Sequence, residues 1–313
     1  MTVVAVYRRF YLLFLLICLS SLTLNVNADG RSPMPSPDAK TQAALASLTT
    51  TNASIPLAPP EPPLPQQSAR TNTSGALIGL DDFRHDPRFA GIDGAGFAVV
   101  VIDTGIDLDH PFFGDDNNGD EIADRIVYQY DFADNDADAT DVHGHGSNVT
   151  SIALSSDVTY TGMAPGADII HLKVFRDSGS GNFGDVEEAL QWVVANAVAY
   201  NIVSVNMSLS DPTSNYQAPT AGYYGIGDEL AALTGLGVTV VSSSGNRFYT
   251  FNGETGVSYP SADPNSFSVG AVFDTDIGAA AYGSGAMAYS SAADRLTPFS
   301  QRHQTMSTIF APG

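Results

Sequence analysis

Residues 99–105 read Val-Val-Val-Ile-Asp-Thr-Gly, an apolar run that ends abruptly on a carboxylate and a glycine. Consecutive apolar residues without polar alternation are typical of a strand covered on both faces, as in a parallel sheet. In open parallel sheets, ligands bind beyond the carboxyl ends of the strands, which is where Asp103 falls. Read alone, the pattern also fits an aspartate that only caps the following turn.

Similar apolar runs recur along the chain and alternate with helical patterns. The runs lie at residues 97–102, 168–174, 202–206, 238–242 and 267–272, and the helical patterns at residues 185–200 and 227–236. Alternating strands and helices predict an α/β fold in which helices cover both faces of a doubly wound, mostly parallel sheet.

Composition and the N-terminus indicate the broad class of protein. The 313 residues include 34 acidic and 13 basic ones, for a net charge of −21, which argues against a nucleic-acid partner.

Residues 1–28 combine Arg8 and Arg9, a short apolar stretch and small residues before Ala28, the pattern of a secretory signal peptide. We therefore expect a secreted protein, extracellular or periplasmic, without membrane association after cleavage. The only cysteine, Cys18, lies within that peptide.

Residues 29–74 differ in texture from the rest of the chain. They are rich in Pro, Ser, Thr and Ala, and such a stretch buries too little apolar surface to offset its ordering entropy. We expect an extended linker, with a short folded pro-segment as the alternative. Residues 75–313 are expected to form one folded domain.

Two further motifs carry polar groups that complement Asp103. Residues 143–149 read His-Gly-His-Gly-Ser-Asn-Val and open a helical pattern, and residues 240–246 read Val-Val-Ser-Ser-Ser-Gly-Asn. A carboxylate can fix the tautomer of an imidazole and stabilise its cation, which suits Asp103 and His145. The Asn246 amide, after a buried strand, can stabilise an oxyanion, or it can simply occupy a left-handed turn.

Together, and in this order, the three motifs resemble those of the subtilisin-like serine proteases (the subtilase or peptidase S8 family). The resemblance implies a three-layer α/β/α fold, incomplete at the C-terminus of the given chain. It implies that Asp103 orients His145, that His145 acts as general base and then acid, and that Asn246 donates to the oxyanion. It also implies a groove for an extended polypeptide substrate. Its residues would be Gly179, Ser180, Gly181, Ser208, Leu209 and Ser210.

The resemblance does not supply a nucleophile within the given sequence. The family's serine lies in a Gly-Thr-Ser-Met-Ala segment that follows an Ala-Pro-Gly, and Ala311-Pro312-Gly313 is the last tripeptide here. We therefore expect the given chain alone to be inactive. Two hypotheses stay open: a secreted serine endopeptidase given without its serine, or a non-catalytic relative that keeps the groove as a peptide-binding module.

An acidic loop at residues 116–124 carries oxygen side chains at alternating positions. Alternating Asp and Asn side chains suit a hard cation such as calcium, although the glycine that usually follows the third ligand is replaced by Glu121. We expect a structural calcium site here and no other cofactor, with a solvated acidic insertion as the alternative. The ligands would be Asp116, Asn118, Asp120 and Asp124.

Overall fold

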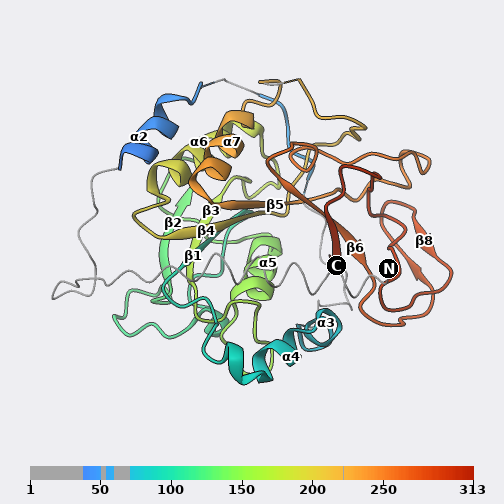
Figure 1. Ribbon diagram of the computed structural model, residues 1–313, viewed down its shortest axis with the longest axis horizontal. Helices are drawn as coiled ribbons and strands as arrows, with labels where there is room; N and C mark the ends of the chain where they lie inside the picture. Colours follow the sequence, from blue (N-terminus) through green and yellow to red (C-terminus); the bar gives the residue numbers. More distant parts are fainter. Residues whose placement is uncertain (1–37, 51–53, 60–70, 221) are drawn as a thin grey trace. The chain divides into compact units, whose positions relative to one another are not determined.

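A seven-stranded sheet forms the centre of the described part of the chain, which in this computed structural model comprises residues 38–50, 54–59, 71–220 and 222–313 (Figure 1). The strand order is β2-β3-β1-β4-β5-β6-β9, and each neighbouring pair is parallel. The predicted doubly wound parallel sheet is therefore confirmed. The strands are β1 (Ala98–Asp103), β2 (Ile126–Asp131), β3 (Asp168–Lys173), β4 (Ile202–Met207), β5 (Thr239–Ser243), β6 (Phe267–Val272) and β9 (Ile309–Pro312), with a separate antiparallel pair of β7 (Ala280–Ala281) and β8 (Met287–Ala288).

Helices cover both faces of this sheet. Helices α6 and α7 lie on one face and α5 lies on the other, which gives the three layers that the family resemblance implies (Figure 1). The helices are α2 (Ala39–Ala46), α3 (Thr71–Ile78), α4 (Leu80–His85), α5 (His145–Leu154), α6 (Phe183–Asn196) and α7 (Gly227–Leu236), with short 3-10 turns η1 (Pro87–Phe89) and η2 (Pro111–Phe113).

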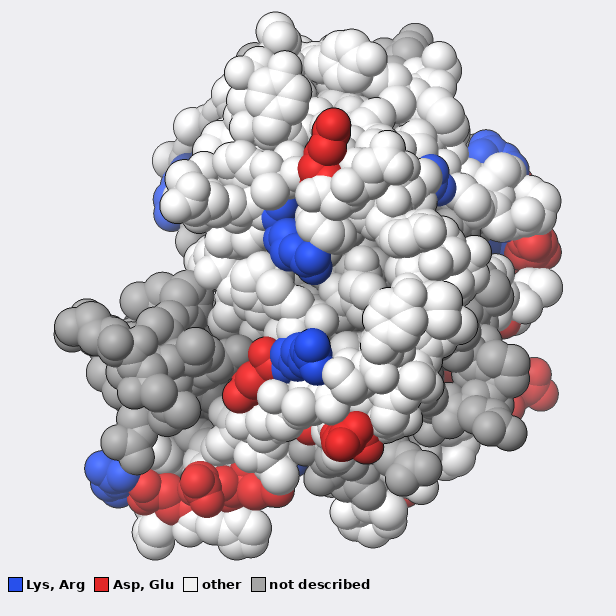
Figure 2. Space-filling model, turned by 90° about the vertical axis from the view of Figure 1, so that its right-hand side faces the viewer, with Lys and Arg blue, Asp and Glu red and all other residues white. Residues whose placement is uncertain are grey.

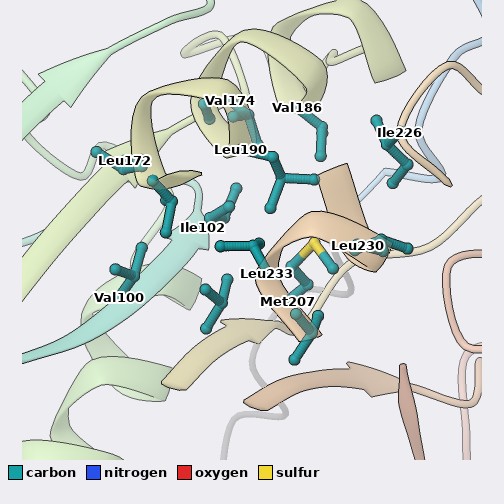
Figure 3. Close-up of a cluster of buried hydrophobic side chains, with 14 of the residues drawn as sticks. Val100, Ile102, Leu172, Val174, Val186, Leu190, Met207, Ile226, Leu230 and Leu233 are labelled. Carbon is teal, nitrogen blue, oxygen red and sulfur yellow. The ribbon is translucent and has the colours of Figure 1, made fainter. Parts of the chain in front are cut away.

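The apolar run of β1 is continuous because both of its faces are buried. Val100 and Ile102 belong to the core cluster beneath α6 and α7, together with Leu190 and other side chains drawn in Figure 3. Val101 points the other way and joins the cluster on the α5 side, where Leu154 packs. Every residue of the run therefore meets an apolar neighbour, and polar alternation would place charge inside one of the two layers.

The observed boundaries follow local capping and edge effects. Helix α6 starts two residues before the predicted range because the Asn182 side chain accepts hydrogen bonds from the amides of Gly184 and Asp185.

Strand β2 was missing from the predicted set. It pairs with β3 alone and is fully buried only at Ile126 and Asp131, so it lacks the apolar run of the inner strands.

Residues 29–74 were expected to form an extended linker or a short folded pro-segment, and their described parts contain a helix and make contacts with the rest of the chain. The Asp38 side chain caps α2, and α2 packs on α6 and α7. Thr49 then donates two hydrogen bonds to the Asp228 carboxylate at the start of α7, both at 2.7 Å. Helix α3 also crosses the expected domain boundary between residues 74 and 75.

The predicted signal peptide, residues 1–28, lies outside the described residues. Among the residues that are described, no helix is both long enough and apolar enough to cross a membrane.

Packing between α6 and the sheet should contribute measurably to the free energy of unfolding. Replacing the fully buried Leu190 by Ala leaves a cavity between α6 and the sheet, so we expect the free energy of unfolding to fall by about 2–5 kcal/mol. Urea denaturation followed by circular dichroism measures this loss. The control is Val158→Ala, at a side chain that is 94% exposed, which should change the same quantity by less than about 0.5 kcal/mol.

Candidate active site

Three adjacent strands bring Asp103, Asn246 and the predicted substrate residues Ser208–Ser210 to one edge of the sheet. Strands β1, β4 and β5 are neighbours and run parallel, so their carboxyl ends lie side by side. Asp103 ends β1, Ser208 directly follows β4, and Asn246 comes three residues after β5. A cavity at this edge is lined by His145, Asn246 and Ser208–Ser210, among other residues.

Asp103 and His145 form a direct pair. The Nδ1 atom of His145 lies 2.6 Å from Oδ1 of Asp103, and the amide of Thr104 donates to the same oxygen at 2.7 Å. The Asp103 side chain is 1% exposed and that of His145 is 24% exposed. The buried carboxylate therefore holds the Nδ1 side of the ring, and the ring edge that carries Nε2 is left for another partner.

The surroundings of His145 act on its pKa in opposite directions. Burial disfavours the charged ring, but the adjacent Asp103 carboxylate, which attracts the imidazolium and hydrogen bonds to it, outweighs burial, with a smaller contribution from Asp141. The pKa of His145 is therefore raised above its ordinary value of 6.5. A carboxylate that stabilises the imidazolium suits a histidine that must take up a proton during a reaction.

Glycines next to His145 serve the backbone rather than the imidazole. Gly144 adopts a left-handed conformation with φ of 88° just before α5 begins. A Cβ on Gly146 would lie 2.2 Å from the carbonyl oxygen of Gly105, so only glycine lets the first turn of α5 approach the end of β1 this closely. This close approach brings His145 within reach of Asp103.

Asp141 holds the two parts of the pair together, and sequence reasoning missed it. Its carboxylate accepts hydrogen bonds from the amides of His143, Gly144 and Ser147 and from the hydroxyls of Ser147 and Thr104. The Thr104 hydroxyl in turn accepts the amide of Gly146 at 2.8 Å. Burial opposes ionisation of Asp141, but these hydrogen bonds keep its pKa below the ordinary value. An aspartate four residues before His145 was the available sequence signal.

Asn246 lines the same cavity as His145. Gly245 precedes it with φ of 101°, and a Cβ there would meet the side chains of Gln301 and Ser258 at 2.2 and 2.6 Å, so this turn requires glycine. Among the described residues, the side-chain amide of Asn246 has no hydrogen-bond partner, and it is free to donate to a group in the cavity.

The predicted substrate-binding residues form two facing edges. Residues 175–181 fold back on themselves: Phe175 bridges Gly181, and Arg176 donates its amide to the carbonyl of Ser180 at 2.8 Å. The buried Lys173 amine lies 2.7 Å from the Asp177 carboxylate and 3.1 Å from that of Asp131, which ties the start of this loop to the sheet. The carbonyl groups of Gly181 and Ser210 then face a common strip.

That strip is occupied by the chain itself, at residues 54–59, which we call the strap. The Leu57 amide donates to the Gly181 carbonyl at 2.9 Å, and the next amide, that of Ala58, donates to the Ser210 carbonyl at 2.7 Å. Successive amides of an extended chain point in opposite directions, so the strap lies as a strand between the two edges. Leu57 is 6% exposed within the main core cluster, and Ala58 and Pro59 line the cavity beside His145.

A nucleophile is not paired with His145 in the described residues. There, no serine or threonine hydroxyl makes a hydrogen bond with its ring; the ring's hydrogen-bond partner is Asp103. The described part of the chain therefore contains the carboxylate, the imidazole and a candidate oxyanion donor.

The acidic loop uses its carboxylates to bind its own backbone. Asp116 accepts the amides of Gly119 and Glu121 at 2.7 and 3.0 Å, and Asp120 accepts that of Ile122 at 3.0 Å. Asp124 accepts the side chain of Asn117 at 2.7 Å. In the part of the chain that the structure describes, no group of three or more His, Cys, Asp or Glu side chains is arranged to hold a metal ion. Calcium binding at this loop stays a prediction.

Comparisons with known proteins agree with this geometry. The fold is a parallel α/β domain in which Asp103, at the end of β1, pairs with His145, at the start of α5. The profile of the Subtilase family matches residues 94–313. The chain belongs to the subtilase family. It is 38% identical to alkaline serine exoprotease A of Vibrio alginolyticus over 151 residues, which cover 46% of this chain and 26% of that protein.

Two other relatives extend the likeness. Subtilisin Savinase of Lederbergia lenta is 30% identical over 183 residues, covering 58% of this chain and 57% of that protein. The crystal structure of a cold-adapted subtilisin-like serine proteinase superposes with a TM-score of 0.51 and 27% identity, covering 72% of this chain and 65% of that one. The chain thus spans less than two thirds of each of these relatives.

The pKa of His145 tests the pair directly. Because the folded-state pKa lies above 6.5, the pair contributes stability below pH of about 6.5 and loses it as the pH rises through the folded-state value. Asp103→Asn removes the charge but keeps the burial, so we expect the pKa of His145 to fall below 6.5. An NMR titration of the His145 ring measures it. Asp86→Asn, at an exposed ion pair with Arg88, should leave it unchanged, and an equal pKa in the wild type and Asp103→Asn contradicts the assignment.

Proposed function

We propose that this chain is part of a secreted serine endopeptidase that hydrolyses peptide bonds by a Ser-His-Asp mechanism. The observation that carries the proposal is the position of the strap. A stretch of polypeptide lies extended between the Gly181 and Ser210 carbonyls, and its end lines the cavity that His145 and Asn246 share. Strand addition of this kind is a common way for a protein to bind peptides.

In this mechanism, the residues of the chain act in a defined order. The Asp103 carboxylate holds Nδ1 of His145, so that Nε2 takes the proton of the nucleophilic serine and later gives it to the leaving amine. The side-chain amide of Asn246 donates to the oxygen that gains negative charge when the carbonyl is attacked. The raised pKa of His145 supports this role because the ring must carry the proton between the two steps.

If the protein continues beyond Gly313, the direction of strand β9 favours a serine supplied from there. Strand β9 is parallel to β6, which is parallel to β5. Residues after Pro312 therefore leave the sheet at the edge where Asp103 and Asn246 lie. We propose that this following segment places the serine against Nε2 of His145.

The second candidate is a peptide-binding module without catalysis. Two observations support it: the strap, a stretch of polypeptide, lies between the Gly181 and Ser210 carbonyls, and in the described residues no hydroxyl bonds to His145. A reading frame that stops at Gly313 supports this candidate, whereas a Gly-Thr-Ser-Met-Ala-type segment beyond it supports the enzyme.

Active-site labelling separates the two candidates. A product that carries the residues following Gly313 should react covalently with a fluorophosphonate probe, because the probe requires an activated serine. His145→Ala in the same product should abolish labelling, since the general base is lost. If a product that is folded by circular dichroism is not labelled, the endopeptidase proposal fails and the peptide-binding module remains.

The strap should keep other peptides out of the groove. Leu57→Asp places a carboxylate in an apolar pocket, which is costly, so we expect the strap to detach. Hydrogen exchange at the amides of residues 57 and 58 should then quicken at least about tenfold, and a fluorescent hexapeptide, Ile-Pro-Leu-Ala-Pro-Gln, should bind. Ser54→Asp adds the same charge at an exposed position and is the matched control. Unchanged exchange in Leu57→Asp would contradict the proposed seating of the strap.

We further propose export by the predicted signal peptide and a structural calcium at residues 116–124. Support for export comes from the sequence of residues 1–28, and an N-terminus at residue 29 in the exported protein tests it.

The calcium proposal is supported by the oxygen side chains of the loop, and binding would require Asp116 to release the amides of Gly119 and Glu121. Calorimetry at millimolar calcium tests it, and a folded chain that takes up no calcium rules it out.

A further inference from the structure

Arg247 differs from every other described arginine in having an unpaired guanidinium. The other six donate to a carboxylate, a carbonyl or a hydroxyl: Arg84, Arg88, Arg125, Arg176, Arg295 and Arg302. For Arg247, the hydrogen bonds in the described part of the chain involve only its backbone. Its amide donates to the Gln301 side chain at 3.3 Å, and its carbonyl accepts the amide of Phe251 at 3.0 Å.

The position of Arg247 makes this unpaired charge significant. It directly follows Asn246 and lines the same cavity as His145. Among the described residues that line the cavity there is no aspartate or glutamate, and His145 and Arg247 are the ionisable ones. The chain as a whole carries 34 acidic residues against 13 basic ones, so an arginine without an acidic partner here is unusual. On the face shown in Figure 2, too, basic side chains are few and well separated.

The strap shows how a polypeptide reaches this cavity. Leu57 and Ala58 are held by the two edges of the groove, and Ala58 and Pro59 already line the cavity with Arg247. A peptide bound in the same register therefore delivers its next residues to the space that His145, Asn246 and Arg247 surround. An arginine side chain binds a carboxylate through two parallel hydrogen bonds, and partial burial strengthens such charge-assisted bonds.

We propose that Arg247 is a specificity-determining residue and that the cleft selects polypeptides with an aspartate or glutamate next to the catalytic pair. This inference rests on the proposed peptide-binding function and names its substrate class. The fixed backbone of Arg247 holds the base of the side chain, and the unpaired guanidinium supplies the donors that an acidic side chain requires. A glutamine in the peptide has nearly the shape of glutamate but no charge to pair with Arg247, and a lysine in the peptide would place a second positive charge against it.

The test compares two peptides that differ only in charge. They are the fluorescent, C-terminally amidated hexapeptides Ile-Pro-Leu-Ala-Pro-Glu and Ile-Pro-Leu-Ala-Pro-Gln, and their binding is measured by anisotropy on the full 313-residue chain and on its Leu57→Asp variant. We expect the Glu peptide to bind to Leu57→Asp about tenfold more tightly than the Gln peptide, a preference that falls in high salt, and both peptides to bind weakly to the full chain with its strap in place. When Arg247→Gln is added to Leu57→Asp, the ratio should fall to about one, and Arg247→Glu in the same background should prefer a Lys-terminated peptide.

Each outcome has a defined meaning. In Leu57→Asp, where the strap no longer fills the groove, a ratio near one, or a ratio that adding Arg247→Gln leaves unchanged, overturns the role of Arg247 while the peptide groove stands. If neither peptide binds to either chain, the groove proposal fails and this inference fails with it. Thermal melting of the Arg247 variants equal to that of the wild type shows that a change in ratio reflects recognition rather than unfolding.

Discussion

The buried carboxylate of Asp103 is the constraint on which the rest of the site depends. A charged group with 1% exposure is tolerated only when it is paired, and the two donors to Asp103 are the Thr104 amide and the His145 ring. The amide comes from the strand end itself, but the ring comes from a helix 42 residues further on. The fold must therefore bring the start of α5 against the end of β1, and Gly146 and Asp141 do so by different means. Gly146 removes the Cβ that would block the approach, and Asp141 binds both parts through Thr104 and Ser147.

Much of this arrangement follows from sequence because inner parallel strands have few alternatives. A run such as Val99–Ile102, apolar at every position, can be satisfied only between two layers of helices, so the three-layer fold and the strand-end position of Asp103 follow together. Edge strand β2 escaped prediction since its middle residues are only half-buried and its pattern is correspondingly mixed. Asp141 escaped too, because its importance comes from where five donors converge, and a single aspartate in a loop gives no periodic signal.

The strap could not be predicted for a different reason. Its composition, rich in proline and small residues, describes a segment that does not fold by itself, and that description is correct as far as local energetics go. What orders it is a groove built from residues more than 100 positions away, where the Gly181 and Ser210 carbonyls accept the amides of Leu57 and Ala58. Prolines at positions 56 and 59 cost nothing here, because the strap's donated bonds come from Leu57 and Ala58. The composition of a segment indicates the conformational entropy lost when it is ordered, but not the hydrogen bonds and buried contacts that the rest of the protein offers it.

The acidic loop at residues 116–124 shows why an oxygen-rich pattern is ambiguous. A side-chain oxygen at every second position suits a cation, but the same spacing lets each carboxylate accept the amide two or three residues ahead. Asp116 and Asp120 do this, and the loop thereby satisfies its own backbone donors. The two uses compete for the same lone pairs. Cation binding would therefore have to be favourable enough to offset the loss of the hydrogen bonds that it displaces. The sequence shows which oxygens are present, and the conformation of the backbone shows which of them are already engaged.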